Sequence, residues 1–190
     1  TLQGFDFKAL VKAARKLQPV DGRMALYVND TLPKAVVDFA HTPDGLEQAL
    51  IALKAHTVGR IWAVFGCGGN RDKQKRALMG AIAEDLADEL VLTSDNPRNE
   101  NPDSILNDIA AGCKKAARII VDRKEAIEYS ISHAAAGDCI LIAGKGHETY
   151  QIVKEKKIPF SDISIAEQAL AQKHAANFSS SSSLEQGGRQ

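Results

Sequence analysis

Residues 61–98 read IWAVFGCGGNRDKQKRALMGAIAEDLADELVLTSDNPR, and this stretch decides the fold. It begins with five apolar residues, passes through a glycine-rich loop into a helical pattern, and ends with a second apolar run at residues 90–92 and a polar loop. Short runs that are continuously apolar, without polar alternation, are typical of strands buried on both faces of a parallel sheet. The stretch therefore predicts a strand, a crossover helix and a second, parallel strand.

The same alternation of strand and helix extends in both directions from this unit. Helices are predicted at residues 43–53, 101–109 and 122–133, and further strands at residues 23–28, 35–40, 119–121 and 139–143. Cap residues and prolines begin these helices, and apolar residues recur on one face of each. We expect an α/β fold: a Rossmann-like open, mostly parallel sheet with helices on both faces. Two later runs, 150–153 and 157–160, predict a C-terminal hairpin that gives the sheet an antiparallel edge.

Composition divides the chain into three parts. Residues 6–17 carry the apolar stripe of an amphipathic helix that stops before Pro19. Residues 21–176 hold the whole strand and helix alternation. From Asn177 onward, five consecutive serines and a Leu-Glu-Gln-Gly-Gly segment offer too little burial to offset their ordering entropy. We expect a leading segment at 1–20, a main domain at 21–176, and a disordered or artificially added tail at 177–190.

The composition of the 190-residue chain excludes several functional classes. Lys and Arg total 24 and so do Asp and Glu, so neither a basic face for nucleic acid nor an acidic tail is expected. No window approaches the ~18 apolar residues of a membrane span, and a soluble, cytoplasmic protein is expected. The three cysteines lie far apart without metal-ligand spacing, which predicts free thiols. Cys67, between glycines, is interpreted as a small packing residue rather than a nucleophile.

Three polar loops follow predicted strands, at residues 66–71, 95–98 and 144–148. Ligands of an open parallel sheet bind outside the carboxyl ends of its strands, which is where these loops lie. The first loop departs from the dinucleotide fingerprint, because Arg71 stands where a third glycine belongs, and no Gly-Lys-Ser/Thr of a P-loop follows it. Each loop alone is most simply a tight turn with solvated charges, whereas three at one edge make a shared site an equal alternative. His41 ends a further strand and, taken alone, is most simply a satisfied histidine.

Five motifs of the chain resemble those of the Mur ligases, which build the stem peptides of peptidoglycan. They lie at residues 22–24, 37–44, 65–73, 95–98 and 144–148, in the family's order and spacing. The resemblance implies the C-terminal domain of such a ligase at 21–176, with the end of the central ATP-binding domain and a linker at 1–20. The family's P-loop and carbamylated-lysine segment are missing from the sequence. The chain alone is therefore expected to be an inactive part of an ATP-dependent, amide-forming ligase.

The resemblance also implies which residues bind substrate. The loop at 95–98 is similar to the motif with which some family members recognise meso-diaminopimelate. Arg71 and Arg98 would grip the distal carboxylate of this amino acid as a fork, and Glu148 with the Gly144 carbonyl would hold its distal ammonium. The implied substrate-binding residues are Arg71, Asp95, Asn96, Pro97, Arg98, Gly144 and Glu148.

Three further residues, Arg23, Asp38 and His41, are similar to residues that approach ATP when the domains of these ligases close. ATP and Mg²⁺ would be bound mainly by the missing central domain, and no metal ligand or covalent nucleophile is expected in this chain. The implied reaction phosphorylates the γ-carboxylate of UDP-MurNAc-L-Ala-D-Glu, and the L-centre amine of diaminopimelate attacks the acyl phosphate.

Two alternatives stay open at this point. The chain could be a stand-alone amino-acid or nucleotide-binding module, or part of a related ligase that adds another amino acid, such as a folylpolyglutamate synthase-like enzyme adding glutamate. The amphipathic segment at 6–17 and the hinge-like Gly22-Arg23-Met24 favour the ligase, because a free sensor needs no interdomain joint.

Overall fold

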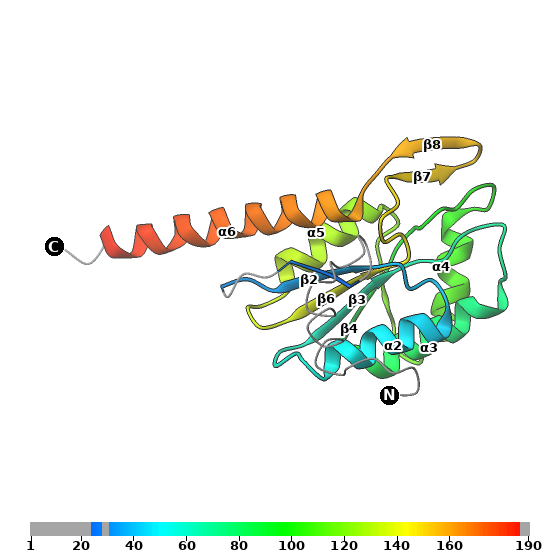
Figure 1. Ribbon diagram of the computed structural model, residues 1–190, viewed down its shortest axis with the longest axis horizontal. Coiled ribbons are helices and arrows are strands. Elements are labelled where there is room, and N and C mark those ends of the chain that lie inside the picture. Colours follow the sequence, from blue (N-terminus) through cyan, green and yellow to red (C-terminus); the bar gives the residue numbers. More distant parts are fainter. Residues whose placement is uncertain (1–23, 28–30, 187–190) are drawn as a thin grey trace, which may run out of the picture.

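The computed structural model describes residues 24–27 and 31–186 (Figure 1). The helix expected at 6–17, the leading segment at 1–20 and Arg23 lie outside the described residues. The elements in chain order are β1 (Ala25–Tyr27), β2 (Lys34–Asp38), α2 (Pro43–Lys54), β3 (Ile61–Phe65), α3 (Gln74–Leu86), β4 (Glu89–Leu92), α4 (Pro102–Ala110), β5 (Arg118–Ile119), α5 (Arg123–His133), β6 (Cys139–Ala143), β7 (Tyr150–Val153), β8 (Lys156–Pro159) and α6 (Asp162–Gln186).

Six strands form one open sheet in the order β1-β2-β6-β3-β4-β5. All neighbours are parallel except β1, which runs antiparallel to β2. Helices α2, α3 and α4 cover one face and α5 and α6 the other (Figure 1). The prediction of an α/β fold with a mostly parallel sheet between two helical layers is confirmed.

The central strands explain why the sequence has apolar runs without alternation. Every residue of β3 and β6 is buried. Ala63 and Phe65 pack into the core beneath α2, α3 and α4, whereas Trp62 and Val64 pack into the core beneath α5 and α6. Successive side chains point to opposite faces of a strand, so a strand covered on both faces needs apolar residues at every position.

The C-terminal hairpin is present, but it forms a two-stranded sheet of its own, β7-β8, rather than an edge of the main sheet. Strand β6 lies between β2 and β3, so both of its edges are already paired and the following strand has no place beside it. The antiparallel edge of the main sheet is β1 instead. The hairpin is joined to the body by a bridge between Val153 and Arg98.

Helix α6 continues through the serine run to Gln186 and extends beyond the sheet (Figure 1), where composition predicted disorder from Asn177 onward. Neither glycine nor proline occurs between Asp162 and Gln186. Extending an existing helix adds one hydrogen bond for each residue fixed and avoids the cost of a new nucleus. Among the helices described, none combines the length and the apolar character of a membrane-spanning segment.

Candidate functional site

The loops that follow β2, β3, β4 and β6 enclose a cavity of about 350 Å³ at the carboxyl edge of the sheet. Among the residues that line it are His41, Arg71, Asp95, Asn96, Arg98, Gly144 and Glu148. These residues come from four segments that are far apart in the sequence. The structure therefore gathers most of the predicted site residues around one space, as expected for strand ends of a parallel sheet.

Two glycines allow the first two loops to touch. A Cβ atom on Gly66 would lie 1.9 Å from the Thr93 carbonyl oxygen, and one on Gly69 would lie 2.0 Å from the Pro97 carbonyl oxygen. The Gly69 N–H also donates to the carbonyl of Asn96 at 2.9 Å. Any side chain at these positions would force the loops apart. In this structure the glycines serve the close approach of two backbones.

Arg98 is held in place through both its backbone and its side chain. Its φ of 51° lies in the left-handed region, and its N–H donates to Ile152 O at 3.0 Å while its carbonyl accepts from Lys154 N at 2.7 Å. The guanidinium Nη1 donates to the carbonyls of Gly69 at 2.9 Å and Asn96 at 3.3 Å. Strand β7 and the glycine loop thus fix the direction in which the guanidinium faces the cavity.

Arg71 sits on the exposed side of the cavity, on a loop that a buried arginine stabilises. Its Nη1 donates to the Asn70 carbonyl at 3.1 Å. Behind it Arg76, only 1% exposed, pairs with Glu100 at 3.0 Å and Asp108 at 2.8 Å. Hydrogen bonds from the Arg76 side chain and the Asn70 N–H lower the pKa of Glu100 to about 2. Glu100 therefore stays ionised and ties the glycine loop to the loop that carries Arg98.

Glu148 and Asn96 form one hydrogen-bonded unit with Lys145. Asn96 Nδ2 donates to Glu148 Oε2 at 2.9 Å, and Lys145 Nζ donates to the same oxygen at 2.9 Å. Asn96 Oδ1 accepts from Ile152 N at 2.8 Å and from Lys145 Nζ at 3.2 Å. Burial raises the pKa of Glu148, but the hydrogen bonds from Lys145 and Asn96 and the charges of Lys145 and Arg98 lower it overall. The site therefore presents a carboxylate with an anchored orientation.

Asp95 lies deeper than Glu148 and is almost fully buried. Burial raises its pKa, although the charges of Arg123 and Lys145 oppose the shift. Its Oδ1 has no hydrogen-bond partner among the described residues, and Lys145 Nζ is 3.9 Å away. Gly144, with a φ of 118°, passes close to the other oxygen. Asp95 is therefore one of the carboxyl groups around which the buried lysine is placed.

Two buried cations at this edge were not among the predicted site residues. Lys145 has no exposed side-chain surface, and Arg123 pairs with equally buried Asp162 through two hydrogen bonds of 2.8 and 2.7 Å. Arg123 also donates to the carbonyls of Ser94 at 3.3 Å and Ala143 at 2.9 Å, which joins the ends of β4 and β6. The position of Lys145, between two glycines directly after a buried strand, is the one feature of the sequence that could have indicated its burial. Arg123 has no such feature, because it reads as an ordinary first-turn residue.

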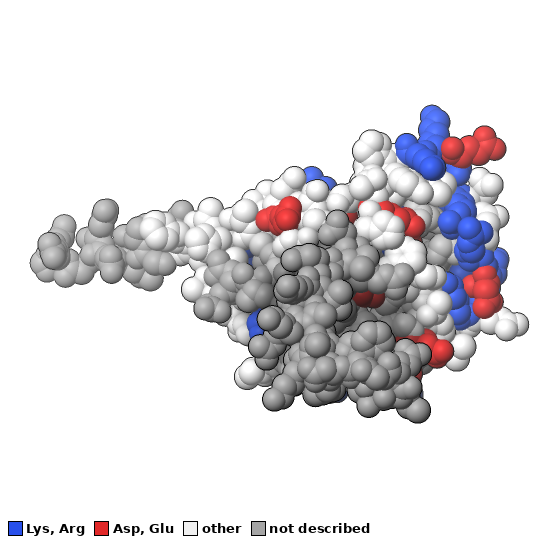
Figure 2. All heavy atoms as spheres, viewed as in Figure 1, with Lys and Arg blue, Asp and Glu red and all other residues white. Residues whose placement is uncertain are grey.

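The remaining predicted residues have other surroundings. Pro97 is buried and lines a separate hollow behind its loop. Asp38 uses its carboxylate to accept the backbone N–H groups of Met24 and Ala40, both at 2.8 Å. His41 lies exposed at the cavity rim with Nδ1 2.8 Å from the Phe39 carbonyl. On the face shown in Figure 2, Lys and Arg side chains gather at the end of the molecule that carries the β7–β8 hairpin.

The surroundings of Cys67 are those of a packing residue. It is buried, and burial raises the pKa of its thiol to about 12, so the reactive thiolate is absent near neutral pH. Cys67, Cys113 and Cys139 are all free thiols, as predicted.

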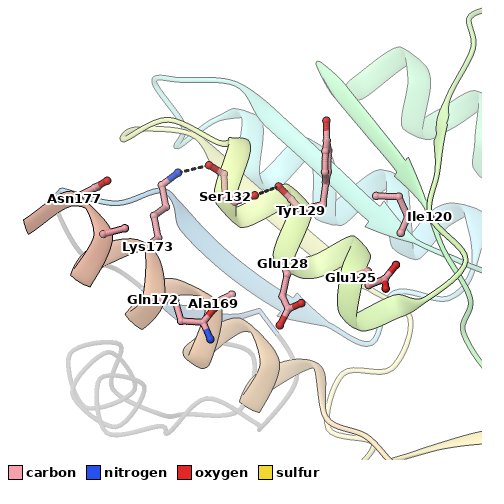
Figure 3. Close-up of a pocket in the computed structure, with 10 residues that line it drawn as sticks. Ile120, Glu125, Glu128, Tyr129, Ser132, Ala169, Gln172, Lys173 and Asn177 are labelled. Atoms are coloured by element: carbon pink, nitrogen blue, oxygen red, sulfur yellow. Dashed lines mark hydrogen bonds between the residues drawn. The ribbon is translucent and has the colours of Figure 1, made fainter. Parts of the chain in front are cut away.

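A second hollow, of about 810 Å³, lies between α5 and α6 (Figure 3). Lys173 donates to the carbonyl of Ser132 at 2.7 Å (Figure 3). It also donates to the carbonyl of Ala134 at 2.8 Å, and the two bonds satisfy the end of α5. None of the predicted site residues lines this hollow. The cavity at the carboxyl edge of the sheet is therefore the candidate site.

Comparisons with known proteins identify the family of the chain. The family model of the Mur ligase, glutamate ligase domain, matches residues 22–146. A relative from Vibrio vulnificus (strain YJ016), named UDP-N-acetylmuramoyl-L-alanyl-D-glutamate--2,6-diaminopimelate ligase, is 50% identical over 169 residues, which are 88% of this chain and 34% of the relative. A solved structure of an enzyme with that name is 44% identical, with a TM-score of 0.76, and covers 91% of this chain and 36% of that chain.

A solved folylpolyglutamate synthase/dihydrofolate synthase from Yersinia pestis is 20% identical, with a TM-score of 0.58 over 74% of this chain and 32% of that chain, and shares the fold alone. The chain spans about a third of the length of the diaminopimelate ligases that it matches. With its parallel sheet, its loop motifs and a family match over residues 22–146, the chain belongs to the Mur ligase family.

Proposed function

We propose that residues 21–176 are the amino-acid-binding C-terminal domain of an ATP-dependent ligase that adds meso-diaminopimelate to UDP-MurNAc-L-Ala-D-Glu in peptidoglycan synthesis. Residues 1–20 would be the end of its central domain and the linker. One observation carries the proposal: Arg71, Arg98 and Glu148 line a single cavity. The chain that holds them is 50% identical to a relative named as a diaminopimelate ligase.

The cavity has the charges that the far end of diaminopimelate requires. This end carries a carboxylate and an ammonium group on one carbon. The guanidinium groups of Arg71 and Arg98 suit the carboxylate, because a planar fork of N–H donors matches two oxygens. Glu148 suits the ammonium group. Lysine lacks the second carboxylate and would leave Arg98 facing the cavity unpaired, at a cost on the order of several kcal/mol.

The domain would contribute positioning to the reaction rather than a covalent step. ATP would phosphorylate the γ-carboxylate of the D-glutamyl residue, and the L-centre amine of diaminopimelate would attack the acyl phosphate and release phosphate. Holding the distal end of the amino acid places that amine for attack. ATP and UDP-linked substrates imply a cytoplasmic reaction.

Two residues near the cavity would serve the nucleotide. His41 at the cavity rim would face ATP, and Asp38 would act by holding the turn beside it through its bonds to Met24 and Ala40. Among the described residues, no three acidic, His or Cys side chains gather as a metal site. In the complete ligase, Mg²⁺ would be bound mainly by the central domain.

Amino-acid selectivity of the complete ligase that carries this domain tests the proposal. Phosphate release would be measured with UDP-MurNAc-L-Ala-D-Glu, ATP and, in turn, meso-diaminopimelate, L-lysine or L-glutamate. We expect diaminopimelate to be preferred on the order of 10³-fold or more, as sites with committed polar partners discriminate. Equal use of lysine or glutamate would refute the proposal. The 190-residue chain alone should hydrolyse no ATP, and turnover by a clean preparation would show that it is not a ligase fragment.

A further inference from the structure

Lys145 is a buried cation beside the cavity that does not line it. Its side chain has no exposed surface, and its ammonium group lies 2.9 Å from Glu148 Oε2 and 3.2 Å from Asn96 Oδ1. Burying a lysine costs free energy unless its charge is paired and hydrogen-bonded, so the groups around a fully enclosed lysine must compensate that cost. Two acceptors lie within hydrogen-bond distance of the ammonium group, and Asp95 Oδ1 lies 3.9 Å away, where it interacts electrostatically without a hydrogen bond.

The backbone turns this lysine inward. Gly144 has a φ of 118° and Gly146 a φ of 53°, so the residues on either side of Lys145 are in conformations that side-chain-bearing residues rarely adopt. The strand β6 ends at Ala143, and without these two turns the next side chains would continue along the strand direction. The glycines therefore serve to enclose the ammonium group behind the cavity wall.

We propose that Lys145 is a positioning residue that holds Glu148 ionised and correctly oriented to receive the distal ammonium of the amino-acid substrate. The inference rests on the function proposed above and deepens it. Lys145 and Asn96 both donate to Oε2 of Glu148, which leaves Oε1 as the oxygen for a ligand. Lys145 also fixes the orientation of the Asn96 side-chain amide. It donates to Oδ1 of that amide, so Nδ2 is left to donate to Glu148.

The electrostatic surroundings of Glu148 support this role. Burial alone would raise its pKa, and Lys145 is the first of the groups that reverse the effect, followed by Asn96 and Arg98. The other charged groups that act on the cluster are Asp95 from the β4 loop, and Arg123 with its partner Asp162 from α5 and α6. Without Lys145, burial and the neighbouring Asp95 would raise the pKa of Glu148 while Arg98 and Arg123 oppose them.

A matched pair of substrates tests the inference in the complete ligase. One is meso-diaminopimelate, and the other is 2-aminopimelate, which has the same two carboxylates but no distal amino group. For Lys145→Met we expect kcat/KM for diaminopimelate to fall on the order of 10- to 100-fold, because a hydrogen bond between charged groups is lost. The value for 2-aminopimelate should change little. Lys156→Met, on exposed β8, is the control and should leave both unchanged.

The outcomes separate this inference from the proposed function. If the unaltered ligase uses diaminopimelate no better than 2-aminopimelate, the proposed recognition of the distal ammonium is wrong. If it does prefer diaminopimelate but Lys145→Met lowers both substrates equally, Lys145 has only a structural role and the inference is overturned. Should Lys145→Met fail to fold, Lys145→Gln keeps an N–H donor without the charge. Lys145→Gln should lower kcat/KM for diaminopimelate by a smaller factor than Lys145→Met and leave kcat/KM for 2-aminopimelate unchanged. Equal losses for the two substrates would overturn the inference.

A second measurement needs no substrate. The carboxyl carbon of Glu148 can be followed by ¹³C NMR through a pH titration of the 190-residue chain. We expect a midpoint below that of an ordinary glutamate, and a higher midpoint in Lys145→Gln. An unchanged midpoint would show that Lys145 does not control the charge of Glu148.

Discussion

Replacing Arg98 by alanine should weaken the use of diaminopimelate by the complete ligase and leave the KM for ATP unchanged. Nη1 of the guanidinium already donates to the carbonyls of Gly69 and Asn96, so a ligand in the cavity that Arg98 lines would bind its remaining N–H groups. Truncating one partner of a buried charge pair costs about 2–5 kcal/mol. Arg98 is only half-buried and Arg71 remains, so we expect the lower end, about 2–3 kcal/mol, which is about a 30- to 150-fold fall in kcat/KM.

A glycine variant separates recognition from stability at the same position. Arg98 has a φ of 51°, which costs a residue with a Cβ about 1 kcal/mol and costs glycine nothing comparable. Arg98→Gly should therefore be about 1 kcal/mol more stable than Arg98→Ala in urea unfolding, yet equally poor with diaminopimelate. Arg98→Lys keeps the positive charge but loses the planar pair of N–H donors. Its kcat/KM for diaminopimelate should lie between that of the unaltered enzyme and those of the alanine and glycine variants. A loss confined to the KM for ATP would refute the assignment of Arg98 to the amino acid.

Three further predictions concern the scaffold of the site. Asp162→Asn should lower the free energy of unfolding by about 3–5 kcal/mol, because it leaves the buried charge of Arg123 without its partner. Gly69→Ala should cost about 1–3 kcal/mol and weaken diaminopimelate use as well, because its Cβ would lie 2.0 Å from the Pro97 carbonyl oxygen. Glu100 has a pKa of about 2 in the folded chain, below its ordinary 4.5, so its stabilising effect is complete above pH 4.5 and is lost as the pH falls toward 2. Urea unfolding at pH 6 and pH 3 should therefore show Glu100→Gln to be less stable than the unaltered chain at pH 6, with a smaller difference at pH 3.

Two variants serve as controls. Lys124→Ala removes an exposed ion pair on α5 and should change stability by less than about 0.5 kcal/mol. Gly137→Ala meets no atom within 4 Å, so it measures the cost of a positive φ without a clash. An Asp162→Asn chain as stable as the unaltered one, a Gly69→Ala chain as stable and as active as the unaltered one, or a Glu100 difference that does not shrink in acid would contradict the respective prediction.

Much of the fold could be predicted from the sequence because its determinants are local. The continuous apolar runs at β3 and β6 indicated strands buried on both faces, and Asn101 and Asp122 indicated helix starts, where both cap a backbone N–H. The hairpin's pairing depended on which strand edges were free, and strand order is not visible in local patterns. Composition predicts disorder where the structure continues α6, because composition does not register the helix that precedes the serines.

The site was predictable in part for the same reason. Arg71, Arg98 and Glu148 stand in loops after strands, and a parallel sheet brings such loops to one edge. Lys145 was passed over because a lysine in a loop is usually solvated, and only the two positive-φ glycines beside it turn it inward. Arg123 pairs with Asp162, 39 residues later in the chain, and no spacing rule connects them.

By itself, the sequence determined the parallel sheet between helices, the loops that carry polar groups, and the family to which those loops belong, because each depends on residues close together in the chain. Only the tertiary structure decided which charges are buried, which carbonyls Arg98 touches and which carboxylates share Lys145. Burial and pairing depend on atoms brought together from distant segments, and the free energy of a charge depends on those atoms far more than on its neighbours in the chain.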